Sequence, residues 1–195
     1  MPRTTAHTND ELTERALLQF WHHGFHATSM DTLVKTTNVS RHGIYTAFGG
    51  KKQLFHACFD RYQDIVVTPA FACVEEPGAD LSAIARYFET QIARGAESGL
   101  PGPGCFVANA STETAPHDAI TQTKVAQHNA RLRNGFQNAL SNTGMAPPSD
   151  RTDALAQVCV VFTNGLWSMS RTTTDADALR AAVKTFLDTL KADLT

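Results

Sequence analysis

The stretch TTNVSRHGIYTAFGGKKQLF, residues 36–55, lies between two amphipathic segments. Its central part, about eight residues from Ser40, is too short to be a stable helix alone, because nucleating a helix is costly. Neighbouring segments must therefore hold it in place. Its outward residues are polar or basic and two lysines follow it, so we expect this short helix to serve as a contact surface.

Apolar residues recur with helical spacing along the chain, and Gly, Pro and polar clusters separate the segments. The first segment ends near Gly24. Thr28 or Ser29 caps the second, with Asp31 completing a capping box with Thr28, and Ser40 caps the third. The later segments cover 54–66, 81–88, 105–114, 120–140, 155–169 and 179–194, with Pro69 kinking or ending the first of them and a loop at 143–150.

No strand alternation persists, so the sequence predicts an all-α fold of about nine helices. The second and third segments, about 29–36 and 40–47, form a helix-turn-helix, with Leu33, Val39, Ile44 and Phe48 as its small core. We expect an N-terminal tail and three-helix domain over residues 1–50. A larger helical domain is expected over 51–195, entered by a long connecting helix from about 51.

Side chains on and beside the second helix match the chemistry of duplex DNA. Arg and His donate to guanine edges or phosphates, Thr contacts bases, and a Tyr hydroxyl reaches a phosphate oxygen. Glycine permits close approach, and a helix N-terminus directs its positive end at the sugar-phosphate chain. The predicted DNA contacts are Thr28, Ser29, Ser40, Arg41, His42, Gly43, Tyr45, Thr46 and Lys51.

The composition agrees with a protein that meets an anion. The 195 residues are 42% hydrophobic and 18% charged, which is enough to bury a core. Residues 1–62 carry seven Lys or Arg against five Asp or Glu, and six of the eight His, whereas the net charge of the chain is −2. No run is long enough to cross a membrane and the polar N-terminus lacks a signal segment, so we expect a cytoplasmic protein.

Residues 11–55 resemble the N-terminal domain of TetR-family transcriptional repressors. The matching positions are Gly24-Phe25, Thr28-Ser29, Val39-Ser40, Tyr45, Phe48 and Lys51, and the departures are Asn38 and Thr46. The stretch GLWSMSRTTTDADALRAAVKTFLDTL, 165–190, resembles the last two, dimer-forming helices of the family. The resemblance implies a homodimer that binds a pseudo-palindromic operator in double-stranded DNA. It also implies that residues 1–50 are the DNA-binding domain and that residues 51–195 are the domain for ligand binding and dimerisation. A small-molecule inducer that enters this larger domain would release the DNA.

The last two helices are apolar over a wide arc, since residues 158–162 read Val-Cys-Val-Val-Phe. One interpretation is a central core helix. The other is that one face packs inside and another meets a second copy of the chain. The dimer interpretation predicts an interface made by Leu155, Val158, Phe162, Leu166, Leu179, Val183, Phe186 and Leu190.

Cys105 follows the break GLPGPG, 99–104, and starts a helix, whose positive end lowers a thiol pKa. The segment GCFVANASTE resembles a TetR subgroup in which a Gly-Cys at this place has, in some members, been linked to sensing oxidants or electrophiles. The alternative is a buried packing cysteine. A mostly apolar pocket, or else solid core, is predicted from Phe59, Tyr62, Phe88, Cys105, Phe106, Asn109, His128, Phe162 and Trp167.

Two other classes of protein are alternatives. A small cysteine-dependent enzyme would pair Cys105 with His117 or His128, and a helical adaptor would bind proteins only. A metal site at His22, His23 and His26 is disfavoured because the adjacent pair does not share a helix face. The four cysteines form no C-x-x-C pair. We therefore predict no catalytic residue, no metal and no cofactor.

Overall fold

The computed structural model describes residues 9–142 and 149–194. In these two ranges the regular structure is helical and no strand occurs. The α-helices are α1 Asn9–His23, α2 Met30–Thr37, α3 Arg41–Phe48, α4 Lys51–Tyr62, α5 Thr68–Glu75, α6 Leu81–Ser98, α7 Phe106–Glu113, α8 Ala119–Ser141, α9 Ser149–Met169 and α10 Ala176–Leu194. A π turn, Gln63–Val67, joins α4 and α5 without a break. With α4 and α5 counted as one continuous helix, the described α-helices number nine, and the all-α prediction is confirmed.

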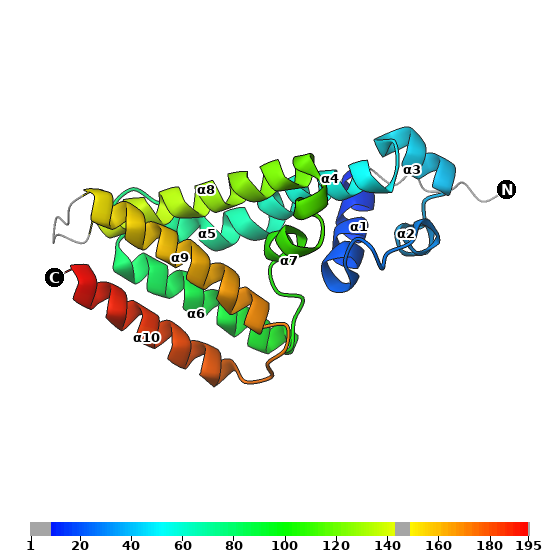
Figure 1. Ribbon diagram of the computed structural model, residues 1–195. Coiled ribbons are helices and arrows are strands. Elements are labelled where there is room, and N and C mark those ends of the chain that lie inside the picture. Colours follow the sequence, from blue (N-terminus) through cyan, green and yellow to red (C-terminus); the bar gives the residue numbers. More distant parts are fainter. Residues whose placement is uncertain (1–8, 143–148, 195) are drawn as a thin grey trace.

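The molecule is elongated, with a small three-helix unit at one end and a larger helical body (Figure 1). Helices α1, α2 and α3 form the small unit, and α4 runs from it into the body. In the body, α8 packs on α9, and α6 packs on both α5 and α10. The short helix α7 lies between the body and α1. Of the loop predicted at 143–150, residues 143–148 fall outside the described residues, while Ser149 and Asp150 already belong to α9.

The helix-turn-helix has the predicted core, with Leu33 and Ile44 fully buried and Val39 and Phe48 packed against them. Its second helix, α3, begins at Arg41 and ends at Phe48, one residue later than predicted.

Local geometry explains two residues of the turn. Asn38 ends α2 in the left-handed region, with φ of 57°, a conformation that Asn tolerates in place of the more common Gly. A Cβ at Gly43 would lie 2.8 Å from Cγ1 of Val39. Glycine is therefore required there by packing inside the turn, a role that the sequence analysis did not assign.

Ser29 and Ser40 cap the two helices of the motif. The Ser29 hydroxyl accepts from the Thr32 N–H at 3.0 Å, and the Ser40 hydroxyl accepts from the Gly43 N–H at 3.1 Å. The predicted capping box is wrong. Thr28 is fully buried and donates to the Gly24 carbonyl at 2.7 Å.

Pro69 does not end the fourth helix, which continues through α5 to Glu75. A proline ring lacks an N–H and clashes with the carbonyl four residues earlier. The π turn precedes the proline, and in it the Thr68 N–H donates to the Gln63 carbonyl, one residue farther back than in an α-helix.

No helix in the described parts of the chain is both long and apolar enough to span a membrane.

Candidate nucleic-acid interface and cavity

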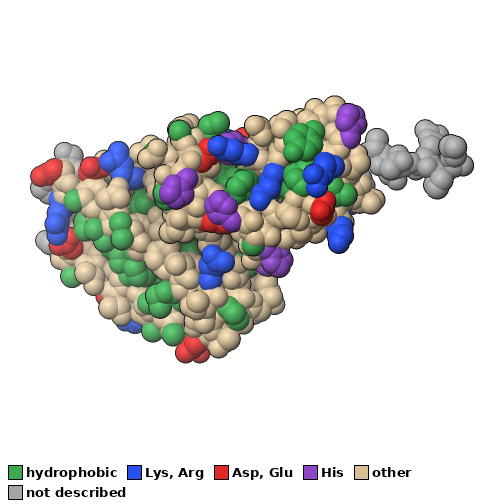
Figure 2. Space-filling view, turned by 45° about the vertical axis from the view of Figure 1, so that its right-hand side comes forward, with side chains coloured by type: hydrophobic (Ala, Val, Ile, Leu, Met, Phe, Trp, Pro, Cys, Tyr) green, Lys and Arg blue, Asp and Glu red, His purple; other side chains and the backbone are tan. Residues whose placement is uncertain are grey.

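The outward face of α3 gathers most of the predicted DNA contacts. Arg41, His42, Tyr45 and Thr46 are exposed, while Ile44 is buried and anchors the opposite face. The exposed capping residues Ser29 and Ser40 lie at the starts of α2 and α3. Figure 2 shows Lys, Arg and His side chains spread over this end of the molecule, with few acidic side chains between them.

Arg41 is held by a neighbour of opposite charge. Its guanidinium donates to the Asp31 carboxylate at 2.8 Å, and both side chains are more than half exposed. Such surface pairs contribute at most about 1 kcal/mol. A phosphate can therefore replace Asp31 at little cost.

Two of the residues predicted to contact DNA, Thr28 and Lys51, are engaged in contacts within the protein. The side chain of Thr28 is fully buried, so the prediction that it contacts DNA is wrong for that side chain. The Lys51 ammonium lies 4.2 Å from the centroid of the Phe25 ring, a cation–π contact. Burial lowers the pKa of Lys51, and the Glu113 charge partly offsets this. A DNA contact by Lys51 stays a prediction.

Glu113, at the end of α7, holds the turn that follows α1. Its carboxylate accepts from the N–H of Phe25 at 3.0 Å and from the N–H of His26 at 2.8 Å. Gly24 has φ of 84°, and a Cβ there would lie 3.0 Å from both carboxylate oxygens. A glycine is thus required for Glu113 to reach the turn.

Two more contacts tie the same part of the body to α1 and to α4. The indole N–H of Trp21, on α1, donates to the Gly104 carbonyl at 2.9 Å. Asp118 caps α8 and also accepts from Lys52 and from His56 Nε2, both on α4. Burial alone would raise the pKa of Asp118, but hydrogen bonds from Lys52, Thr121 and His56 hold it well below its ordinary value. We call residues 104–118 the coupling segment.

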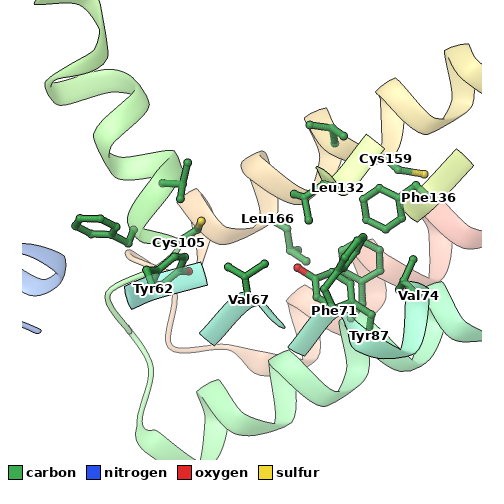
Figure 3. Close-up of a cluster of buried hydrophobic side chains, with 14 of the residues drawn as sticks. Tyr62, Val67, Phe71, Val74, Tyr87, Cys105, Leu132, Phe136, Cys159 and Leu166 are labelled. Carbon is green, nitrogen blue, oxygen red and sulfur yellow. The ribbon is translucent and has the colours of Figure 1, made fainter. Parts of the chain in front are cut away.

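A cavity of about 620 Å³ lies in the body, next to the coupling segment. Five aromatic side chains line it: Trp21, Tyr62, Phe71, Tyr87 and Trp167. The π turn contributes its three consecutive apolar residues, Ile65 to Val67. In Figure 3, Cys105 lies beside Tyr62 at the start of α7, with Val67 between this pair and the rings of Phe71 and Tyr87.

The structure brings four of the predicted pocket residues to this cavity, namely Tyr62, Cys105, His128 and Trp167. The other five do not line it, and the prediction is wrong for them. Phe59, Phe88 and Phe106 are solid core. Phe162 stacks on Phe186 with ring centroids 3.9 Å apart, and the Asn109 amide donates to the Pro103 carbonyl.

The thiol of Cys105 is buried, with 6% of the residue exposed. Burial raises its pKa, and hydrogen bonds from the Ala108 N–H, the Tyr62 hydroxyl and the Val107 N–H only partly offset this. The predicted lowering of the thiol pKa is therefore wrong, because desolvation outweighs the helix N-terminus.

His128 is buried beside the cavity, and Gln63 lies 3.0 Å from its Nδ1. Burial and the nearby charge of Arg131 lower its pKa to about 4, so its imidazole is neutral at neutral pH. In the described ranges neither His128 nor His117 hydrogen-bonds Cys105, whose thiol pairs with Tyr62. The arrangement needed for a cysteine nucleophile with a histidine base is not formed.

Most of the predicted dimer residues belong to the core of one chain. Five of them are at most 6% exposed: Leu155, Leu166, Leu179, Val183 and Leu190. The prediction is wrong for these five, because a side chain already buried has no surface left for a partner. Val158 is 49% exposed and therefore stays a predicted interface residue. Val161 and Met169, also on α9, are exposed as well.

Among the described residues, no group of three His, Cys, Asp or Glu side chains is placed to hold a metal ion. Several residues of the site were missed by the sequence analysis, above all Glu113, Asp118 and Gln91. No local pattern marks them, because their partners are distant in the chain or, for Gln91, because the cavity forms only in the folded body.

The fold and the exposed face of α3 define a helix-turn-helix protein with a separate helical body. Residues 12–58 match the family described as bacterial regulatory proteins, tetR family. Residues 81–185, more than half of the chain, match the family described as transcriptional regulator LmrA/YxaF-like, C-terminal domain. The chain therefore belongs to the TetR family and is a transcriptional regulator.

Two individual relatives are also described as transcriptional regulators. The HTH-type transcriptional repressor ComR of Escherichia coli (strain K12) is 30% identical over 159 residues, 78% of this chain and 75% of ComR. The uncharacterized HTH-type transcriptional regulator YezE of Bacillus subtilis (strain 168) is 25% identical over 185 residues, 90% of this chain and 92% of YezE.

Solved structures share the fold. A cysteine mutant of the TetR-family regulator CifR, complexed with 26-bp operator DNA, superposes with a TM-score of 0.80 at 19% identity, covering 95% of this chain and 98% of that one. A TetR-family regulator from Cytophaga hutchinsonii gives a TM-score of 0.81 at 17% identity, with 94% and 93% covered.

The substitution Glu113→Gln tests the contact between the body and the turn after α1. It leaves one acceptor oxygen and no charge, so we expect the free energy of unfolding to fall by about 1–2 kcal/mol. Amide hydrogen exchange at Phe25 and His26 should become about tenfold faster. Glu97→Gln, at an exposed position of α6, is the matched control. Unchanged exchange at both amides in Glu113→Gln would show that the contact does not hold the turn.

The neutral state of His128 predicts a pH dependence of stability. Unfolded histidine titrates near 6.5, whereas the folded group has a pKa of about 4, so the unfolded state binds more protons between these values. This part of the stability is present above 6.5 and is lost as the pH falls toward 4. From about pH 7 to about pH 5, we expect the native chain to lose about 2 kcal/mol more than His128→Gln.

Urea unfolding at one protein concentration measures this difference. His117→Gln, which changes an exposed histidine, should behave like the native chain. If His128→Gln loses as much stability as the native chain, the buried imidazole is not the cause.

Proposed function

We propose that this regulator is a homodimeric repressor that binds a pseudo-palindromic operator and leaves it when a small molecule occupies the cavity. One observation carries this proposal: the coupling segment meets the cavity at Gly104 and Cys105. It also holds α1 and the turn after it through Gly104 and Glu113, and the start of α4 through Asp118. A cysteine-dependent enzyme and a protein-only adaptor have no comparable support.

The exposed face of α3 is the proposed reading surface. Arg41, His42, Tyr45 and Thr46 would contact the major groove, and Ser29, Ser40 and Lys51 the backbone. One such short helix covers only a few base pairs, and each mismatched pair costs about 1–3 kcal/mol. Two copies related by a twofold axis double the readout and define the half-site spacing. The operator is then nearly palindromic.

Two neighbouring faces would form the dimer interface. On α9 the exposed residues Ala154, Val158, Val161, Gly165 and Met169 follow helical spacing in one stripe. On α10 a stripe of small residues faces outward or is half-buried: Ala178, Ala182, Thr185 and Thr189. Small side chains allow two helices to approach closely. Phe162 and Phe186, stacked and half-buried between α9 and α10, join the two stripes.

Release would follow from movement of the coupling segment. A ligand in the cavity presses on Gly104 and Cys105, which start α7, and α7 is only two turns long. Its other end carries Glu113. A shift of α7 along its axis therefore changes the position of the turn after α1, and with it the position of α2 and α3 relative to those of the partner subunit. Two recognition helices that no longer match the half-site spacing lose the operator.

Modification of Cys105 is a second candidate for the signal, favoured by the fact that this cysteine lines the cavity. Its burial and its raised pKa disfavour it, because the thiolate is the nucleophile. We therefore propose non-covalent binding as the signal, with Cys105 as a packing residue of the cavity wall.

We propose the division of labour at residue 50 that the sequence predicted, because α4 begins at Lys51 and carries the links to both parts. Residues 1–50 would read DNA and residues 51–195 would bind the ligand and dimerise. The place of action would be the cytoplasm, where the operator lies.

Substitutions on α3 test the DNA-binding proposal. Arg41→Ala and Tyr45→Ala should each weaken binding to the DNA upstream of the protein's own gene by about tenfold or more, without loss of fold, because both side chains are exposed. Affinity should fall steeply with salt, and each lost phosphate contact should lower the slope by about one. Gel shifts at several salt concentrations measure both effects.

The control is Lys184→Ala, which removes an exposed charge on α10, far along the chain from the motif. If Arg41→Ala binds the operator as tightly as this control, the groove assignment is wrong.

An electrophile separates the two candidate signals. We titrate the operator complex with N-ethylmaleimide and compare the native chain with Cys105→Ser by gel shift. Because the thiol is buried and protonated, we expect both proteins to respond equally. Cys73→Ser removes the half-buried thiol, so a weaker response of this variant would show that the electrophile acts at Cys73. If the native chain and Cys73→Ser release the operator DNA but Cys105→Ser does not, Cys105 is the sensor.

A further inference from the structure

The chemistry of the cavity wall changes in one direction along α6. Tyr87, Gln91, Arg94 and Ser98 lie three or four residues apart, so they share a face of the helix, and all four line the cavity. Tyr87 is 7% exposed, Gln91 is half-buried, and Arg94 and Ser98 are exposed. This face therefore leads from an aromatic interior, past an amide, to a guanidinium at the mouth.

Gln91 provides an unused hydrogen-bond donor. Its Nε2 is buried and has no hydrogen-bond partner among the described residues. A buried polar atom without a partner costs about 1–3 kcal/mol. A turn of the half-buried Gln91 side chain brings this N–H to the cavity, where an acceptor atom on an occupant would remove the cost.

Arg94 provides an unpaired positive charge. No ion-pair partner is found for it in the described ranges, whereas Arg86 on the same helix faces Glu76 and Arg131 is held by Glu75. His22, also exposed, lines the cavity as well. In the described part of the chain, no Asp or Glu lines the cavity. Its formal charge is therefore positive, which disfavours cations and favours anions.

The inner walls are suited to flat apolar groups. Phe71 and Tyr87 meet edge to face with centroids 5.2 Å apart, and the Trp167 N–H points to the Tyr87 hydroxyl at 3.4 Å. The volume of about 620 Å³ lies within the range of sites for drug-sized ligands. One small ring would leave much of it empty.

We propose that the ligand of this cavity is an aromatic carboxylate of two or more rings. Its rings lie between Tyr62, Phe71, Tyr87 and Trp167, and its carboxylate lies toward the mouth, where Gln91 donates a hydrogen bond and Arg94 pairs with the charge. The inference of a ligand site rests on the proposed function, and the class of ligand rests on the wall of α6.

The protein contains a direct reporter, since both of its tryptophans, Trp21 and Trp167, line the cavity. Quenching of tryptophan fluorescence in the full chain, without DNA, measures binding of three probes with one ring system. The probes are para-phenylbenzoate, the neutral para-phenylbenzamide and the cationic para-phenylbenzylammonium. We expect the carboxylate to bind about tenfold more tightly than the amide, and the ammonium to bind most weakly.

Two variants assign the preference to α6. Arg94→Gln should abolish the tenfold preference for the carboxylate and leave the affinity for the amide unchanged. Gln91→Leu should weaken both probes several-fold. Arg86→Gln, on the same helix but outside the cavity wall, should change neither. Far-UV circular dichroism checks that each variant is folded.

Three results would overturn the inference: no quenching by any probe, an amide or ammonium that binds as tightly as the carboxylate, or an unchanged preference in Arg94→Gln. Operator gel shifts with para-phenylbenzoate are read separately. If the carboxylate binds with the predicted preference but the operator complex persists, the ligand class stands and the proposed release mechanism fails. If the chain binds no operator at all, the proposed function fails while the fluorescence result remains valid.

Discussion

The carboxylate of Glu113 is the contact on which the arrangement of the two parts depends. Two consecutive N–H groups, at Phe25 and His26, are left without helical partners where α1 ends, and such groups need acceptors. Glu113 supplies an acceptor oxygen to each of them, from a position 88 residues away from Phe25. Gly24 leaves room for it. The DNA-reading helices are thereby attached to α7 as well as to α4, and the body can influence their position.

The cavity lies where an occupant would contact the coupling segment. A packed core transmits force but accepts no ligand, whereas the cavity here has its wall formed partly by Gly104 and Cys105. The π turn before Pro69 adds three apolar residues to the wall. Buried His128 stays neutral and Cys105 stays protonated. The interior is thus kept free of charge, and the positive charge of Arg94 is confined to the mouth.

Helix α9 shows the limit of reasoning from periodicity. Its wide apolar arc left two interpretations open, a core helix or a helix with one inward and one outward apolar face, and the residues chosen for the dimer were mostly inward ones. Leu155 and Leu166 are buried in a single chain, while Val158 and Val161 are exposed. Two apolar stripes on one helix have the same spacing. Only the neighbours α8 and α10 decide which stripe is covered.

Local chemistry in the sequence by itself determined the helices, the helix-turn-helix with its caps at Ser29 and Ser40, and the resemblance to the TetR family. These features depend on residues within a few positions of one another, which is where propensity and capping act. Only the tertiary structure decided that Phe59 and Phe106 are core while Tyr62 lines a cavity, since all are buried aromatics on helices. It also decided the partners of Glu113 and Asp118, because contacts between residues 60 or more positions apart arise only when the helices pack.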